Sequence, residues 1–247
     1  MINIITQNVG GMAYEKIQDL IEFFLYFNSR GNTIFCLQEV PQGIREEYEN
    51  KETTKKQCFF TTLYGWKHIG NDEFVKSCDY DPDTRKCVAF FWSKSFKNRG
   101  IEPLCFYDDD ESKVEPRKRL GVRTTPWINL EHRKYGHIWI LGVHLSQNKV
   151  KQRKVLREVS KKIRELEEKD SRWIVVGDFN LVPESLRETK FKPIDDMSAT
   201  NICEKTGKYL ILDYIFVDNR FNLISYEVDE IGELKNSDHA KVEAYIC

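Results

Sequence analysis

Several side chains suited to acid–base chemistry or metal binding follow directly after apolar runs. The tetrapeptide Gly177-Asp178-Phe179-Asn180 follows the run 173–176, whose short, β-branched pattern predicts a buried strand. Side chains just past the carboxyl end of such a strand are held at an edge where binding sites form. Other polar residues at the ends of apolar runs are Asn8, Glu39, His144, Asp213, Asp238 and His239. The pattern predicts one site built from distant parts of the chain.

Taken singly, most of these residues have ordinary structural explanations. Asn8 could shape a turn, and Glu39 could end a solvated strand. Asp178 could cap a turn, and a lone histidine such as His144 is more often a hydrogen-bonded core residue. Asp213 is different, because it stands in an apolar run and an unpaired buried carboxylate is costly. It therefore needs a partner.

His239 is the natural partner for Asp213, since a carboxylate fixes the tautomer of an imidazole and favours its protonated form. The resulting cation suits an anionic transition state. The oxygens of Asn8, Glu39 and Asp238 are hard ligands that suit Mg²⁺ or Mn²⁺, and such an ion commonly bridges to a substrate phosphate.

Asp178 and Asn180 supply the remaining chemistry. Asp178 could orient or deprotonate an attacking water, and Asn180 could donate to phosphoryl oxygens. Together with the predicted metal ligands, these groups indicate a phosphoester hydrolase.

Six short strings occur in a fixed order along nearly the whole chain. They are Gln7-Asn8-Val9-Gly10-Gly11, Leu37-Gln38-Glu39-Val40, Gly142-Val143-His144-Leu145-Ser146, Gly177-Asp178-Phe179-Asn180, Leu212-Asp213-Tyr214-Ile215 and Ser237-Asp238-His239. Each string alone is weak, but the ordered set is specific. It resembles the motifs of the endonuclease/exonuclease/phosphatase superfamily, whose members include DNase I and exonuclease III.

The resemblance implies a role for each matching position. It implies that Asn8 and Glu39 bind a divalent ion, Mg²⁺ or Mn²⁺, and that Asp238 belongs to the same metal environment. It also implies in-line attack by water on phosphorus. The residues it places in catalysis are His144, Asp178 on the water, Asn180 on the transition state, and Asp213 orienting His239.

Two positions bear on the branch of the superfamily. His144-Leu145-Ser146 stands where relatives of exonuclease III carry Tyr-x-Pro-Asn, and it looks more like DNase I, the cytolethal distending toxin nuclease, tyrosyl-DNA phosphodiesterases and several phosphatases. The segment 117–123 resembles the strand that brings an arginine to the phosphate in the toxin nuclease. Arg117 is the matching position, although Lys118 departs from the usual proline. Solvent exposure of Arg117 is an equal alternative.

The elements that must position these residues alternate between strand and helix. An order of strand, helix, strand is expected over residues 2–7, 15–27 and 33–37, and a second amphipathic helix over 149–166. Residues 42–85 give no clear assignment. Further strands are expected at 86–92, 120–130, 137–143, 173–176, 210–217, 223–228 and 240–246. We expect an α/β fold, a four-layer sandwich of two mostly antiparallel sheets flanked by helices, which is also the fold of the superfamily.

Composition favours one domain over residues 1–247, with no membrane span and no secretion signal, so an intracellular protein in cytoplasm or nucleus is expected. Seven cysteines with irregular spacing favour reduced thiols, with Cys36 and Cys105 in the core. Cys78 and Cys87 flank a loop that a disulfide could close in an oxidising compartment.

Charge is balanced overall, with 38 Lys and Arg against 39 Asp and Glu, but it is unevenly spread. Segment 149–164 holds eight basic residues and one acid, and segment 113–123 holds five and one. Such patches could meet phosphates, or could simply form a solvated helix face.

Three functions remain open. The first is a metal-dependent nuclease, acting as a monomer on DNA ahead of RNA. The second is a phosphomonoesterase or a phosphodiesterase of lipids or inositol phosphates, for which the aromatic residues within 59–66 are candidate docking groups. The third is an inactive binding module of the same fold.

Overall fold

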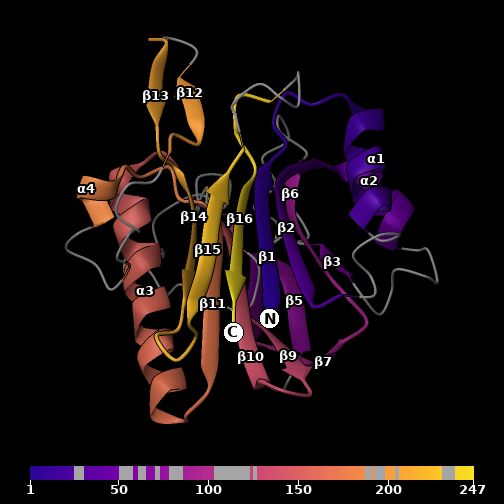
Figure 1. The fold of residues 1–247 in the computed structure, drawn as a ribbon, viewed down its shortest axis with the longest axis vertical. Coiled ribbons are helices and arrows are strands. Elements are labelled where there is room, and N and C mark those ends of the chain that lie inside the picture. The colour runs from indigo at the N-terminus through magenta and orange to yellow at the C-terminus, as the bar shows by residue number, and fades with distance from the viewer. Residues whose placement is uncertain are drawn as a thin grey trace.

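The computed structural model is built around two six-stranded sheets packed face to face, with helices on both outer sides (Figure 1). It describes residues 1–24, 31–49, 58–60, 65–69, 73–77, 86–102, 123–124, 127–186, 191, 198–203, 206–229 and 237–247.

The first sheet has the strand order β15-β16-β1-β2-β6-β3. Strands β1 and β2 run parallel, and the other described pairs in this sheet are antiparallel. Its strands are β1 (Ile2–Asn8), β2 (Thr33–Pro41), β3 (Cys58–Phe60), β6 (Lys86–Trp92), β15 (Leu223–Val228) and β16 (Val242–Ile246).

The second sheet has the order β14-β11-β10-β9-β7, with β8 paired to β10. Here β10 and β11 are the parallel pair. Its strands are β7 (Phe96–Glu102), β8 (Arg123–Thr124), β9 (Trp127–His132), β10 (Gly136–His144), β11 (Arg172–Asp178) and β14 (Asp213–Val217). Two separate hairpins pair β4 (Gly65–Ile69) with β5 (Glu73–Ser77), and β12 (Asn201–Cys203) with β13 (Lys208–Leu210).

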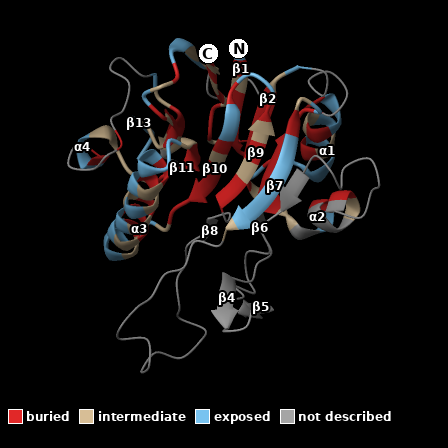
Figure 2. Cartoon of the chain, turned by 90° about the horizontal axis from the view of Figure 1, so that it is seen from below, coloured by how far each residue is buried: buried red, intermediate tan, exposed pale blue. Residues whose placement is uncertain are grey.

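Three apolar clusters fill the spaces between the layers, and the buried strands stand out in red in Figure 2. The central cluster lies between the sheets and includes Ile4 and Ile174, because alternate side chains of each strand point inward. A second cluster packs the second sheet against α3 (Lys149–Glu168), and a third packs the first sheet against α1 (Tyr14–Phe23) and α2 (Gln42–Glu49). The helices α1 and α2 therefore lie opposite α3.

Helix α3 forms because its apolar residues fall on one stripe and its first turn is capped. Val155, Val159 and Ile163 are buried, and Asn148 accepts hydrogen bonds from the backbone N–H groups of Val150 and Lys151. The short helix α4 (Pro183–Leu186) follows β11. None of the helices within the described ranges is long and apolar enough to cross a bilayer.

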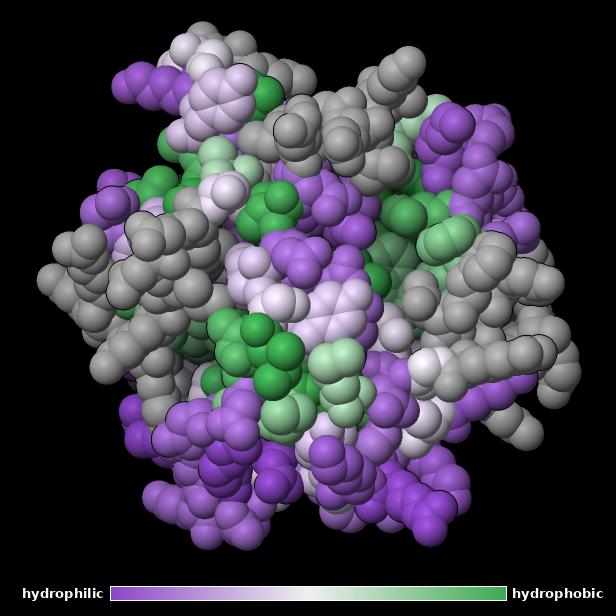
Figure 3. Space-filling model, in the orientation of Figure 1, coloured by the Kyte–Doolittle hydropathy of each residue, from purple (hydrophilic) through white to green (hydrophobic). Residues whose placement is uncertain are grey.

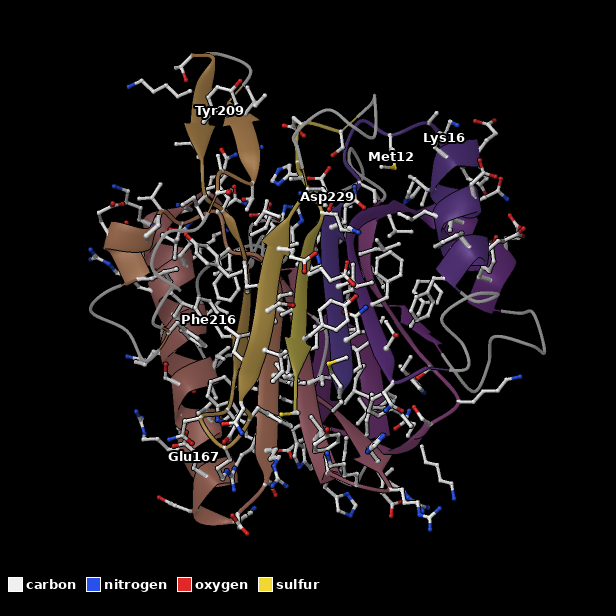
Figure 4. The ribbon with its side chains drawn as sticks, viewed as in Figure 1. Met12, Lys16, Glu167, Tyr209, Phe216 and Asp229 are labelled. Carbon is white, nitrogen blue, oxygen red and sulfur yellow. The ribbon has the colours of Figure 1, made fainter. Side chains whose placement is uncertain are left out.

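The two parallel pairs carry their polar residues to the same end of the sandwich. Strands β1, β2, β10 and β11 all end there, and β14 begins there because it runs antiparallel to β11. The β12–β13 hairpin rises beyond this end (Figure 1), with Tyr209 near its tip (Figure 4). Apolar surface gathers over β14 and β15, and hydrophilic surface covers the lower end of α3 (Figure 3).

The expected fold class is confirmed, while several element boundaries were wrong. The strand expected over 210–217 is divided into β13 and β14, because the chain turns between sheets at Ile211 and Leu212. Within the strand expected over 120–130, the described residues belong to β8 and to β9, which continues to His132. Strand β7 was missed because most of it is exposed and it lacks alternation. Cys36 is buried as expected. The predictions for Cys105 and for a Cys78–Cys87 pair lie outside the described side chains.

Candidate active site

The carboxylate of Asp178 lies at the centre of the predicted site and is almost fully buried. Its Oδ2 accepts a hydrogen bond from Asn8 Nδ2 at 3.1 Å and from Asn180 Nδ2 at 3.2 Å. The Nε2 atoms of His144 and His239 lie 3.6 Å and 4.0 Å from the same oxygen. Asp178 therefore connects strand ends from both sheets.

Asp213 and His239 form the predicted pair. Nδ1 of His239 donates to Asp213 Oδ2 at 2.8 Å, so that Nε2 is the ring atom left facing Asp178. Asp213 is directly opposite Asp178 in the β11–β14 ladder and is fully buried. The ladder thus sets two carboxylates beside one imidazole.

Glu39 approaches the site from β2. Its Oε1 lies 3.5 Å from His144 Nε2, and its side chain is about one-fifth exposed. A β-bulge between Leu37 and Val40 interrupts the pairing with β6, and Glu39 takes a positive φ of 62°. Bulges and left-handed backbone commonly aim a side chain at a functional site.

Gly10 leaves room for the predicted metal ligands. A Cβ at this position would lie 2.6 Å from Glu39 Oε2 and 3.2 Å from Asn8 Oδ1. The Gly10 N–H also donates to Asn8 Oδ1 at 2.9 Å. Two hard oxygens therefore border one small space that any larger residue would fill.

Asn180 is held by its backbone as well as by its side chain. Its N–H donates to Asp178 Oδ1 at 2.8 Å, and its Nδ2 donates to the carbonyl of Leu145 at 2.9 Å. Its φ is 50°, an unusual conformation for a residue with a Cβ. Gln152 of α3 donates to the carbonyl of Asn180 at 2.9 Å and so ties the helix to this turn.

Two supporting residues were not identified as site residues from the sequence. Thr200 Oγ1 accepts from the N–H groups of Asp213 at 3.0 Å and of Leu212 at 2.9 Å. Asn201 donates to the carbonyl of Asp238 at 3.2 Å and pairs with His239 as an isolated β-bridge. These contacts join the β12–β13 hairpin to the catalytic candidates, and no local periodicity marks them.

Ser237 was recognised only as part of a motif. Its hydroxyl donates to the carbonyl of Asn8 at 2.8 Å and accepts from the N–H of His239 at 3.1 Å. It therefore fixes the final loop against β1.

Burial and charge shift the pKa values of the central groups in physically consistent directions. Desolvation, and then the nearby Asp213 charge, raise the pKa of Asp178 to about 7, although His239 and hydrogen bonds oppose the rise. For His239, burial lowers the pKa, but the carboxylates of Asp213, Asp178 and Asp238 outweigh it and raise the pKa to about 10. His239 is therefore a cation at neutral pH.

Two groups of side chains fit a divalent cation. Asn8 and Glu39 offer the hard oxygens that suit Mg²⁺ or Mn²⁺. Asp178, Asp213 and His239 offer ligand atoms within 4.8 Å of one another. The 2.8 Å hydrogen bond between Asp213 Oδ2 and His239 Nδ1 leaves Asp213 Oδ1 and His239 Nε2 for an ion, which would have to displace the Nε2 proton that the raised pKa of His239 holds at neutral pH. The group at Glu39 needs no such displacement and is therefore favoured.

Most of the predicted site residues meet at this end of the sandwich. Asp238 lies beside His239, and its carboxylate accepts a 3.4 Å hydrogen bond from Asn201. Arg117 lies outside the described residues. The residues brought together are Asn8, Glu39, His144, Asp178, Asn180, Asp213 and His239.

Comparison with known proteins gives a family match over most of the chain. Residues 5–239 match the sequence profile of the Endonuclease/Exonuclease/phosphatase family. A search of curated protein sequences gives no match.

Solved structures of similar fold cover nearly the full chain. D. rerio TDP2 humanized by 14 mutations is 13% identical, with a TM-score of 0.65 and coverage of 100% of this chain and 98% of that one. Another structure of D. rerio TDP2 is described as complexed with single-strand DNA product. An endonuclease/exonuclease/phosphatase from Bacteroides vulgatus is 15% identical, with a TM-score of 0.63 and coverage of 100% and 98%. ANGEL2, described as a 2′,3′-cyclic phosphatase in complex with adenosine-2′,3′-vanadate, is 12% identical, with a TM-score of 0.64 and coverage of 99% and 95%. At these identities the likeness shows a shared fold.

Proposed function

Because the chain belongs to the endonuclease/exonuclease/phosphatase family, we propose that it is a divalent-metal-dependent phosphodiesterase that hydrolyses nucleic acid, with DNA preferred over RNA. The observation that carries this proposal is the convergence on Asp178 Oδ2 of Asn8, Asn180, His144 and His239. These side chains come from both sheets, and their chemistry matches the demands of phosphoester hydrolysis. One acid can act on water while amide and imidazole N–H groups face the phosphoryl oxygens.

In this proposal Asp178 acts on the attacking water. A general base works best when its pKa lies near the working pH, and burial together with Asp213 raises the pKa of Asp178 to about 7. The base accepts a proton as the water oxygen attacks phosphorus in line with the leaving oxygen, whose bond to phosphorus breaks and which takes up a proton from solvent. The Leu145 carbonyl holds one Nδ2–H of Asn180, and the other Nδ2–H, now bonded to Asp178 Oδ2 at 3.2 Å, would turn to a phosphoryl oxygen of the bound substrate.

His239 supplies positive charge for the transition state. Its Nδ1–H is committed to Asp213, so Nε2–H, which lies 4.0 Å from Asp178 Oδ2, is the donor left for a phosphoryl oxygen. His144 offers a second ring nitrogen 3.6 Å from Asp178 Oδ2. Two preorganised donors in a buried site stabilise developing negative charge more strongly than mobile water does.

Asn8 and Glu39 would hold the divalent ion, with Asp238 in the same environment. When bound, such an ion polarises a phosphoryl oxygen and neutralises charge on the phosphate. Glu39 is suited to this role because its carboxylate is partly open and borders the space left by Gly10.

The same groups could serve a phosphomonoester, a lipid or an inositol phosphate. ANGEL2 and TDP2 share the fold with this chain, and their described ligands differ. A substrate panel therefore decides between these classes.

A panel of substrates tests the proposal. Duplex DNA, single-stranded DNA, RNA, 5′-tyrosyl DNA and inositol phosphates are incubated with the protein in Mg²⁺ or Mn²⁺, with and without a chelator. We expect chelator-sensitive cleavage of DNA at the highest rate. If every polynucleotide remains intact while a monoester or a lipid is hydrolysed, the nuclease proposal is wrong and the phosphatase or lipid alternative takes its place.

A further inference from the structure

An uninterrupted row of exposed basic side chains runs along the outer face of α3. It starts at Lys149 and continues at four-residue spacing, with a last step of three residues. The α3 row consists of Lys149, Arg153, Arg157, Lys161 and Arg164, all exposed. Residues at this spacing are neighbours on one side of a helix, and the outward side of α3 is pale blue in Figure 2.

Helix stability does not explain this pattern. Like charges at i and i+4 repel each other, so each step of the α3 row disfavours the helix. The helix dipole favours acids in the first turn and bases in the last, yet α3 has no acid in its first turn and no base in its last. Its acids gather at the other end, with Glu167 at the lower end of the helix in Figure 4.

Neighbouring acids leave most of the α3 row unneutralised. Arg157 lies 3.4 Å from Glu158, an exposed pair of small energetic value. Lys162, which is not part of the row, forms ion pairs with Glu102 and Glu165. Among the described residues, no carboxylate pairs with the remaining members of the row.

The α3 row begins beside the candidate active site. His144 ends β10, and Asn148 caps α3 four residues later. Gln152 of the first helical turns donates to the carbonyl of Asn180. From Lys149 the row leads away from the site for about 22 Å, at about 1.5 Å per residue.

We propose that the α3 row is a track for the phosphate backbone of the polynucleotide, carrying one strand away from the scissile phosphate. The inference rests on the proposed nuclease function and adds a binding surface to it. Positive charge without a matching acid is complementary to phosphate, and the length of the row corresponds to about six nucleotides at about 3.4 Å each. Contacts of this kind position a strand without reading its sequence.

The test removes charge from the part of the α3 row that lies beyond the site. The variant Arg153→Gln/Lys161→Gln/Arg164→Gln relieves repulsion and keeps good helix formers, so the helix should remain folded. The control Lys94→Gln/Lys97→Gln/Arg133→Gln removes three exposed charges, one from the β6–β7 turn, one from the start of β7 and one from the β9–β10 turn. Circular dichroism and thermal melting check both proteins.

The readout is cleavage of single strands of about 20 and about 3 nucleotides over a range of salt concentrations. For the long strand, log(kcat/KM) should fall less steeply with log[salt] in the row variant than in the parent. The slopes should differ by about 2, since the variant removes three phosphate contacts and each contributes about 0.7. Raising the salt concentration from about 50 to about 200 mM should then reduce kcat/KM of the parent protein about 20-fold more than that of the row variant. The preference of the parent for the long strand should shrink in the row variant and persist in the control.

The contrary outcomes separate the two proposals. Equal salt slopes in parent, row variant and control, with DNA still cleaved, would overturn the track and leave the nuclease function intact. If the parent cleaves no polynucleotide, both proposals fail. Row-dependent binding to phosphatidylserine vesicles, without row-dependent binding of oligonucleotides to the Asp178→Asn protein, would assign the α3 row to a membrane surface and overturn the track.

Discussion

Replacing Asp178 by asparagine should change how the stability of the metal-free protein depends on pH. The folded-state pKa of Asp178 is raised to about 7, from an ordinary value of 3.8. The native state therefore holds this proton more tightly than the unfolded chain does. The stability contributed by protonated Asp178 is fully present below pH 3.8 and is lost as the pH rises through 7.

The expected size follows from the two pKa values. Between about pH 5 and about pH 8, ionisation of Asp178 should cost the folded protein on the order of 3 kcal/mol. The contribution of protonated His239 to the stability of the folded protein also falls over this range. The folded state raises the pKa of His239 from 6.5 to about 10, so this contribution is lost as the pH rises from the lower value to the higher. Asp178→Asn removes the first contribution and retains much of the second.

The assay is denaturant unfolding of the parent and of Asp178→Asn at several pH values in the presence of a chelator. The free energy of unfolding of the parent should fall more steeply between about pH 5 and about pH 8, by on the order of 3 kcal/mol, or roughly 5–10 °C in melting temperature. Asp19→Asn, on the exposed side of α1, is the matched control and should follow the parent. Parallel curves for the parent and Asp178→Asn would refute the claim that burial raises the pKa of Asp178.

Three further substitutions probe other parts of the site. Thr200→Val should destabilise the protein by about 2–4 kcal/mol in denaturant unfolding, because two backbone N–H groups lose their buried acceptor, while Thr200→Ser should be close to the parent. Equal destabilisation by both would indicate a packing effect. Asp213→Asn should lower kcat by about 100- to 10,000-fold with little change in KM, because His239 loses the carboxylate that orients it; an unchanged kcat would remove His239 from the mechanism. Glu39→Gln should raise the metal concentration needed for half-maximal activity by about 10-fold or more, whereas an unchanged metal dependence would favour the Asp178, Asp213 and His239 group as the metal site.

The sequence predicts the fold class and most of the site because both depend on strong, short-range patterns. The run 173–176 and the stripe of α3 are apolar with clear periods, and the predicted site residues stand where those patterns stop. The cost of burying a charge predicted that Asp213 needs a partner, His239 was the natural candidate, and the 2.8 Å contact agrees with that reasoning.

The supporting contacts of the site were not predictable in this way. Thr200 and Asn201 act through long-range hydrogen bonds to Asp213, Asp238 and Leu212, which leave no local signal. The division of the strand expected over 210–217 has the same origin. Residues before the break pair with β12 and residues after it pair with β11, in different sheets. An apolar run in the sequence does not indicate which strand each of its residues will pair with.

The most direct test of the central claim is a cleavage assay of the parent protein and Asp178→Asn on a labelled DNA strand with Mg²⁺ or Mn²⁺. We predict cleavage by the parent that a chelator abolishes and the metal restores, and a loss of about 1,000-fold or more in kcat for Asp178→Asn with its fold retained. Undiminished cleavage by folded Asp178→Asn would contradict the account.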